Sequence, residues 1–178
     1  MKHAALLILT AASAAFAADV PLGESFDKSL ANAEREFVSL AEAMPARGYN
    51  FAPTGGEFKG VRTFAQQVKH VAAVNYMVGA AILGEKPPRD LGGGESGPDN
   101  LKDKDQIVAF LKDSFAYLHK AMLTLTAQNL TQSIQSPFGN NQVPKASMAL
   151  EGVEHPFDHY GQMVVYARMN GIVPPASR

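Results

Sequence analysis

Two histidines four residues apart, His155 and His159, are the first feature of this sequence that could carry chemistry. In a helix, this spacing places both imidazoles on one face and within reach of a single ion. Neutral imidazole suits borderline metals, which include zinc, nickel, copper and ferrous iron. Pairs of this kind are also common in helices that bind nothing, so the spacing alone leaves a structural role open.

A third histidine, His70, lies where an earlier helical segment becomes apolar, and its face of that segment carries Gln67, Val74 and Met77 rather than charged residues. A lone buried histidine usually satisfies one hydrogen bond and nothing more. Three neutral imidazoles from two helices, in contrast, leave coordination positions open for water or substrate. The three histidines therefore favour a reactive metal site over a closed structural one.

Several polar neighbours could support such a site without binding the ion. Gln162, three residues after His159, could orient a ligand or a bound water, although a glutamine on a helix surface is the simpler interpretation. Glu154 and Asp158 adjoin the histidines in sequence, but successive helical side chains diverge by about 100°, so we expect neither as a direct ligand. His119 is expected to be structural or solvated. The sequence assigns no catalytic residue.

Four segments with helical periodicity would position these residues, because their apolar side chains recur every three or four positions. The segments span approximately residues 22–44, 60–83, 103–130 and 147–170. Gly84 follows the second segment, Asp103 suits the start of the third, and Ser147 is a plausible cap for the fourth. No segment alternates with a period of two over enough residues to predict a strand.

The connections between these segments are rich in proline and glycine. The connection at residues 85–100 contains two adjacent prolines and three adjacent glycines, which predicts a long exposed crossover. Four long helices joined in this way predict an all-α fold, a four-helix bundle whose cofactor sites lie between facing helices. The second half of the second segment is apolar on nearly all sides, so we expect this helix to be the most buried.

The N-terminus has the pattern of a secretory signal peptide, with a basic start, a short apolar run and the small-residue sequence Ala15-Phe16-Ala17. We predict a signal peptide over residues 1–17, cleaved after Ala17, with Ala18 as the alternative. A membrane anchor needs about 20 apolar residues, and this run is shorter and is followed by Asp19. We therefore expect an exported protein, periplasmic or secreted, with no stable membrane insertion and one domain over residues 18–178.

The charge balance and the absence of cysteine narrow the function classes. The chain has 16 Lys and Arg against 17 Asp and Glu, with no basic block, which argues against binding dominated by nucleic-acid phosphates. A small molecule is the more natural partner. Because the chain contains no cysteine, the fold needs no disulfide, and any thiol in the chemistry has to come from a substrate.

Two stretches, Phe64–Tyr76 (FAQQVKHVAAVNY) and His155–Pro175 (HPFDHYGQMVVYARMNGIVPP), resemble the DinB/YfiT superfamily of proposed metalloenzymes. The similarity covers essentially the whole chain after the signal. It implies an up-down-down-up bundle with a long crossover between helices two and three. It also implies a metal ion held by one histidine of helix two and an HxxxH pair of helix four, the places of His70, His155 and His159. The resemblance further implies nickel or zinc as the metal ion, with water at the remaining coordination positions. It also implies a homodimer.

Pro156 is a departure that affects the histidine pair. It removes a backbone donor inside the fourth helix and disfavours helical geometry at His155. Either the helix kinks there, or regular helix begins only near Pro156, where proline is tolerated in the first turn. His155 is therefore the least secure of the three ligands.

Three interpretations fit these features. In the first, the protein is an enzyme whose metal lowers the pKa of water or of a substrate thiol. Some members of the superfamily that the chain resembles use low-molecular-weight thiols as S-transferases or isomerases. Because an exported protein would not meet cytosolic thiols, hydrolysis or another metal-assisted reaction stays open. The alternative is a non-catalytic envelope protein that binds a metal or a small ligand. A helical interaction module with incidental histidines is the third interpretation.

Overall fold

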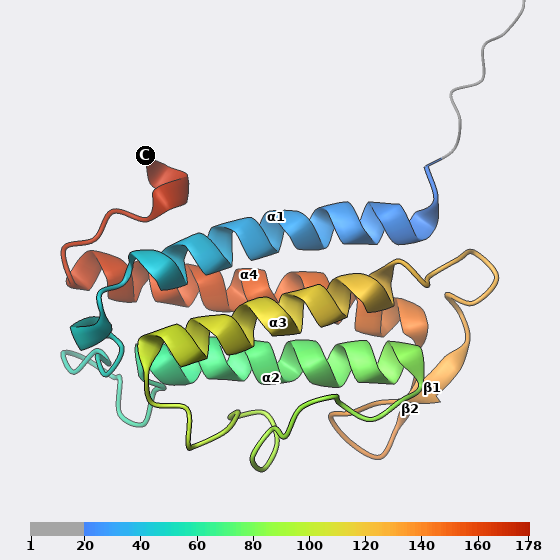
Figure 1. Ribbon diagram of the computed structural model, residues 1–178, viewed down its shortest axis with the longest axis horizontal. Coiled ribbons are helices and arrows are strands. Elements are labelled where there is room, and N and C mark those ends of the chain that lie inside the picture. Colours follow the sequence, from blue (N-terminus) through green and yellow to red (C-terminus); the bar gives the residue numbers. More distant parts are fainter. Residues whose placement is uncertain (1–19) are drawn as a thin grey trace, which may run out of the picture.

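A computed structural model describes residues 20–178 of the chain (Figure 1). Its four long helices are α1 (Leu22–Ala43), α2 (Phe64–Leu83), α3 (Lys104–Met122) and α4 (Lys145–Met169). Two 3₁₀ turns, Ala46–Gly48 and Pro175–Ser177, and a small two-stranded sheet complete the fold. The all-α prediction is confirmed, whereas the signal-peptide prediction for residues 1–17 lies outside the described residues. Within the described part, no helix has the length and apolar character needed to cross a membrane.

The helices follow the up-down-down-up order. In Figure 1, α1 and α4 run in one direction and α2 and α3 in the other. Helix α2 packs against both α3 and α4, and α1 packs against the same two helices. Because α2 and α3 are parallel, the chain must return along the outside of the bundle between them, and residues 84–103 form this long crossover beside α2 (Figure 1).

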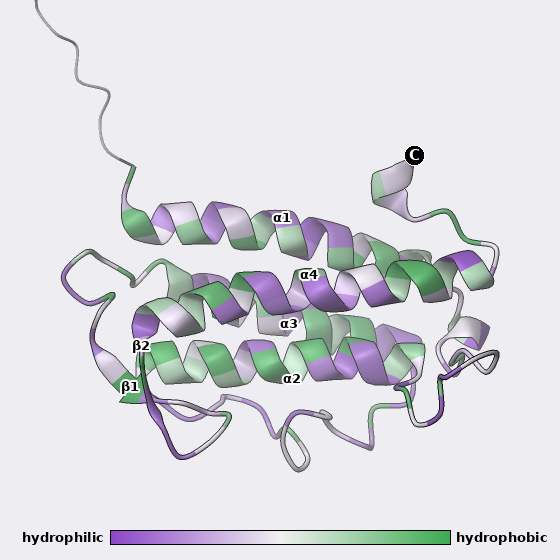
Figure 2. Cartoon of the chain, turned by 180° about the vertical axis from the view of Figure 1, so that it is seen from behind, coloured by the Kyte–Doolittle hydropathy of each residue, from purple (hydrophilic) through white to green (hydrophobic). Residues whose placement is uncertain are grey.

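Helix α2 is the most buried helix, as its composition predicts. Fifteen of its 20 residues are buried, because α3, α4 and the crossover cover different faces of it. The approach of α3 is close: a Cβ atom at Gly79 would lie 2.8 Å from Cε1 of Tyr117. Figure 2 shows the apolar residues of α2 in the view from behind. His70 therefore belongs to the helix with the largest buried fraction.

Two helix ends differ from the sequence prediction because side chains bond to the local backbone. Helix α2 starts at Phe64 rather than near residue 60, since Thr63 caps it and forms a reciprocal capping box with Gln66. Helix α3 ends at Met122 instead of near residue 130. Beyond it, the Thr126 backbone N–H donates to the Asn129 side chain at 2.9 Å, and such local bonds compete with helix continuation.

Helix α4 also differs from the prediction at its start. It begins at Lys145 after Pro144, so Ser147 lies inside the first turn and does not cap the helix. The helix continues through Pro156 to Met169, so the alternative that regular helix begins near Pro156 is wrong. Pro156 deprives the Gly152 carbonyl of its usual helical donor, but 11 helical residues before it and 13 after it maintain the helix.

A short hairpin precedes α4 and was not expected from the sequence. Strands β1 (Ser133–Gln135) and β2 (Gln142–Pro144) pair antiparallel, with Ile134 opposite Val143. Three residues are too few to produce a recognisable alternating pattern. The hairpin lies beside the C-terminal end of α2 (Figure 1).

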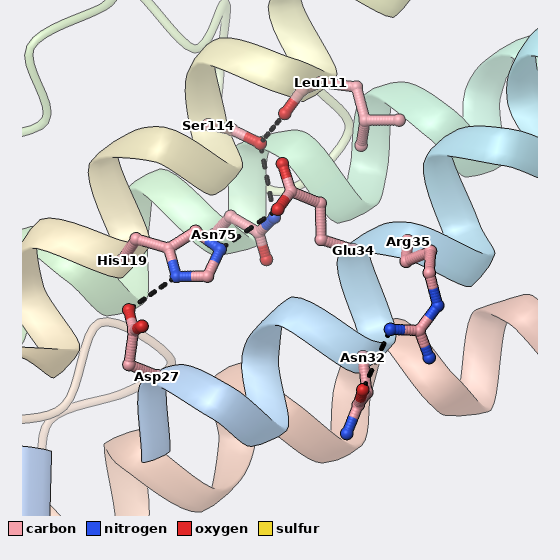
Figure 3. A network of polar contacts seen from close by, with 8 residues as sticks. All are labelled: Asp27, Asn32, Glu34, Arg35, Asn75, Leu111, Ser114 and His119. Carbon is pink, nitrogen blue, oxygen red and sulfur yellow. Dashed lines mark hydrogen bonds and ion pairs between the residues drawn. The ribbon is translucent and has the colours of Figure 1, made fainter. Parts of the chain in front are cut away.

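His119 of α3 ties α3 to α1 through two carboxylates (Figure 3). Its Nδ1 lies 2.6 Å from Asp27 Oδ1, and its Nε2 lies 3.1 Å from Glu34 Oε2. The hydrogen bond with Glu34 is the largest cause that raises the pKa of His119 above its ordinary value, with Asp27 adding to it against the opposing effect of burial. The charged imidazolium can donate to both partners at once, which gives this histidine a structural role.

Replacing His119 by Gln should destabilise the protein more at low pH than at high pH. A raised pKa in the folded state means that the stabilisation is fully present below the unfolded-state pKa and is lost as pH rises through the folded-state value. We expect a loss of roughly 1–3 kcal/mol in the free energy of unfolding near pH 5.5 and a smaller loss near pH 9, measured by urea denaturation. Lys112→Gln, which breaks an exposed ion pair with Glu42, should show no such difference. Equal losses for His119→Gln at both pH values would contradict this assignment.

Candidate metal centre

The structure brings His70 of α2 together with His155 and His159 of α4. One nitrogen of each ring lies within 4.8 Å of one nitrogen of the other two. The ring centroids are 4.5–4.9 Å apart, and Nε2 of His155 lies 3.1 Å from Nε2 of His70. A tetrahedral ion with nitrogen ligands at about 2.0–2.1 Å requires nitrogens roughly 3.3 Å apart. The cluster therefore has dimensions that could hold one metal ion.

Hydrogen bonds fix which nitrogen of two of these rings is free. Nδ1 of His70 donates to the backbone carbonyl of Glu95 at 2.6 Å, and Nδ1 of His159 donates to Oε1 of Gln67 at 2.6 Å. With the proton on Nδ1, each ring has a lone pair on Nε2, as histidine ligands of metals usually do. The two imidazoles are therefore held in the tautomer that a metal ion needs.

His155 differs from the other two rings. Its Nε2 faces His70, while its Nδ1 is buried and has no hydrogen-bond partner among the described residues. Pro156, next to it, does not remove it from the cluster. His155 therefore lacks an Nδ1 hydrogen bond like those of His70 and His159, and its one side-chain hydrogen bond among the described residues joins its Nε2 to Nε2 of His70.

A chain of side chains extends behind His159. Nε2 of Gln67 donates to Oε1 of Gln162 at 3.1 Å, and Nε2 of Gln162 donates to Oδ2 of Asp158 at 2.9 Å. Gln162, the residue singled out from the sequence, thus acts through Gln67 and does not bond to a histidine itself. The sequence indicates Gln67 only as a neighbour of His70 on the same helix face, and its position three residues before that histidine is the one local signal for its contact with His159.

The three imidazoles are neutral at neutral pH. Burial, followed by the neighbouring histidines and Arg62, lowers the pKa of His155 to about 3. Burial is also the largest cause for His159, whose pKa falls to about 4, and it lowers the pKa of His70. Because a metal ion binds the neutral ring, no proton has to be removed at neutral pH before the ion can bind.

The crossover holds the Glu95 carbonyl in place by packing tightly on α2. Lys69 is buried and donates through Nζ to the backbone carbonyl of Pro98 at 2.8 Å. Gly97 has a φ of +70°, and a Cβ there would lie 2.9 Å from the Lys69 carbonyl oxygen, so both its backbone conformation and the space favour glycine. These contacts with Lys69, the residue before His70, fix the position of the segment that carries the hydrogen-bond acceptor of His70.

Carboxylates surround the cluster without joining it. Glu154 and Asp158 are exposed and lie outside the group of converging ligand atoms, in agreement with the directions expected from the helix. Glu151, one turn before His155, is half-buried, and burial raises its pKa, with Glu154 and Glu95 adding to the shift. Within residues 20–178, the converging group consists of three imidazoles only.

The fold and this cluster define an all-α bundle with a three-histidine site between two helices that are adjacent in space. The sequence profile of the DinB superfamily matches residues 29–163, and the chain belongs to that superfamily. No curated protein matches the sequence.

Two solved structures support the fold. The chain is 17% identical to a DinB-like protein from Bacillus cereus ATCC 10987, with a TM-score of 0.65 over 85% of this chain and 95% of that one. It is 14% identical to a conserved protein from Enterococcus faecalis, with a TM-score of 0.66 over 84% of this chain and 97% of that one. At these identities the similarity shows the arrangement of the helices alone.

Replacing Gln67 by Met should weaken metal binding while leaving the three histidines in place. The variant keeps the length of the side chain but removes the acceptor that orients His159, and the loss of such a supporting contact typically lowers metal affinity about 10- to 100-fold. Competition with a chromophoric chelator would measure the affinity. Gln162→Met, which removes only the support of Gln67, should have a smaller effect. Unchanged affinity in Gln67→Met, with an unchanged melting temperature, would show that this contact does not orient a ligand.

Proposed function

We propose that this protein is a metal-dependent enzyme in which His70, His155 and His159 bind one divalent metal ion. The observation that carries the proposal is the convergence of three neutral imidazoles without a fourth side-chain ligand among the described residues. A closed structural site has four protein ligands, whereas three leave a position for a water or a substrate. When bound there, the ion would lower the pKa of a water or of a small thiol and so supply the nucleophile.

The residues of the chain would determine how this site is used. Gln67 and the Glu95 carbonyl hold two of the rings, so the open position would have a fixed direction relative to α2 and α4. Because the chain has no cysteine, a thiol nucleophile would have to be a substrate. The reaction is therefore proposed as hydrolysis or as transfer to a small thiol.

Nickel and zinc are the metals that we propose. Both accept imidazole nitrogen readily, and the described cluster offers no thiolate or carboxylate that would favour another ion. The resemblance to the DinB superfamily implies the same two metals.

A non-catalytic role in metal or small-ligand binding is the second candidate. The buried position of His70 and His159 supports tight retention of an ion, which sequestration needs. The two functions differ in exchange at the metal: an enzyme needs an exchangeable position and a turnover that is lost when the metal is removed. Stoichiometric, tightly held metal with equal reaction rates in the loaded and metal-free protein would favour the binding role.

Export, dimerisation and the kind of partner are also part of the proposal. The pattern of residues 1–17 supports export to the periplasm or beyond, and the mass of the mature chain from an expressing bacterium would test cleavage. The resemblance supports a homodimer, which light scattering would test. The net charge of −1 supports a small-molecule partner over nucleic acid.

The purified protein should contain about one metal ion per chain, and replacing His70, His155 or His159 by Ala should abolish this content. Each substitution removes one of only three ligands, so the remaining pair would bind weakly. Elemental analysis measures the result directly. His119→Gln is the matched control, because this histidine bonds to Asp27 and Glu34 on α1 instead, and it should retain the metal. A wild-type protein that neither contains nor takes up nickel or zinc would contradict the proposal.

A further inference from the structure

The outer face of α4 carries apolar side chains that the described part of the chain leaves uncovered. Helix α4 packs on α1 and α2, and in Figure 2 no helix lies in front of it. On this face Leu150 is 50% exposed, Phe157 37% and Val165 48%, and Val153 and Val164 beside them are half-buried. A surface helix normally presents charged and polar residues on this side, so the face has the composition of a contact surface.

A glycine lies in the middle of this face. Gly161 follows Phe157 by four residues and precedes Val165 by four. Glycine inside a helix costs roughly 0.5–1 kcal/mol relative to alanine, and a Cβ at Gly161 would meet no atom within 4 Å. Packing within the chain therefore does not require a glycine here, whereas close approach of a second helix across α4 does.

Two opposite charges lie at equal distances from Gly161. Glu154 is seven residues before it and Arg168 is seven residues after it, and both are exposed. Seven residues correspond to two helical turns, so each charge lies about 10 Å along α4 from Gly161 and on nearly the same face. The ion pairs within residues 20–178 involve other side chains. Neither charge is therefore paired within the described part of one copy.

This arrangement of charges selects both the partner and its direction. A second copy of α4 that lies antiparallel, with a two-fold axis at Gly161, places Glu154 opposite Arg168 of the partner subunit at both ends of the contact. The same axis places Phe157 opposite Val165 of the partner subunit. A parallel copy in the same register would instead place each charge beside a like charge.

We propose that two copies of this protein dimerise through the outer faces of their α4 helices, which cross antiparallel at Gly161. The inference rests on the homodimer of the proposed function and assigns its interface, and it does not depend on the metal ion. Burial of the apolar side chains provides the affinity. The two pairs of Glu154 with Arg168 fix the direction, because complementary charges suppress the wrong arrangement.

Charge reversal tests the antiparallel register, with the dimer dissociation constant measured by sedimentation equilibrium. Glu154→Arg and Arg168→Glu should each raise this constant about tenfold or more, because each places like charges opposite one another at both ends of the contact. The double variant should return the constant close to the wild-type value. Residues 154 and 168 lie about 21 Å apart along one helix, so this rescue has to occur between two copies.

Replacing Gly161 by Trp tests the crossing point. The indole would occupy the space between the two helices and should abolish the dimer, but it should not lower the melting temperature, because the position is open within one copy. Lys120→Trp is the matched control, since Lys120 is exposed on α3, and it should leave the dissociation constant unchanged.

A monomeric wild-type protein would overturn the homodimer and this interface together. A dimer that persists in Gly161→Trp, or a double charge variant that stays as weak as the single variants, would overturn the α4 interface alone. The metal content of each variant is measured separately by elemental analysis, so a failure of the proposed metal site is distinguished from a failure of this interface.

Discussion

The packing of α2 against α4 is the constraint on which the candidate site depends. His70 is separated from His155 by 85 residues, and only this helix pair brings their rings into contact. The same packing buries the imidazoles, and burial lowers the pKa of all three. Position and charge state therefore have one cause: the interface that gathers the rings also keeps them neutral.

The crossover between α2 and α3 connects the fold to the site. An up-down-down-up bundle needs a long return segment, and here that segment covers α2 and supplies the Glu95 carbonyl to His70. Gly97 permits the close contact with α2 that this arrangement requires. A connection imposed by topology thus also orients the imidazole of His70.

Pro156 illustrates how tertiary structure overrides a local preference. A proline inside a helix costs about 3 kcal/mol, yet α4 stays continuous through it. The helix has buried residues both before and after Pro156, including Met148, Ala149, Met163 and Ala167, and their burial offsets the local cost. His155 consequently stays in the cluster, although its Nδ1 lacks a hydrogen bond such as those that Nδ1 of His70 and Nδ1 of His159 make.

The sequence by itself determined the four helical segments, the bundle class and the pairing of His155 with His159, because apolar periodicity and a four-residue spacing are local properties. The place of His70 beside them was implied by the resemblance to the DinB superfamily, and the packing of α2 against α4 decided it. It did not determine the end of α3, where Thr126 and Asn129 bond locally, or the three-residue strands, which are too short for a pattern. Gln67 and the Glu95 carbonyl emerged only from the tertiary structure. A backbone carbonyl leaves no trace in the residue type, and the contact of Gln67 with His159 spans 92 residues, so only the packing of α2, α4 and the crossover could decide which groups orient the imidazoles.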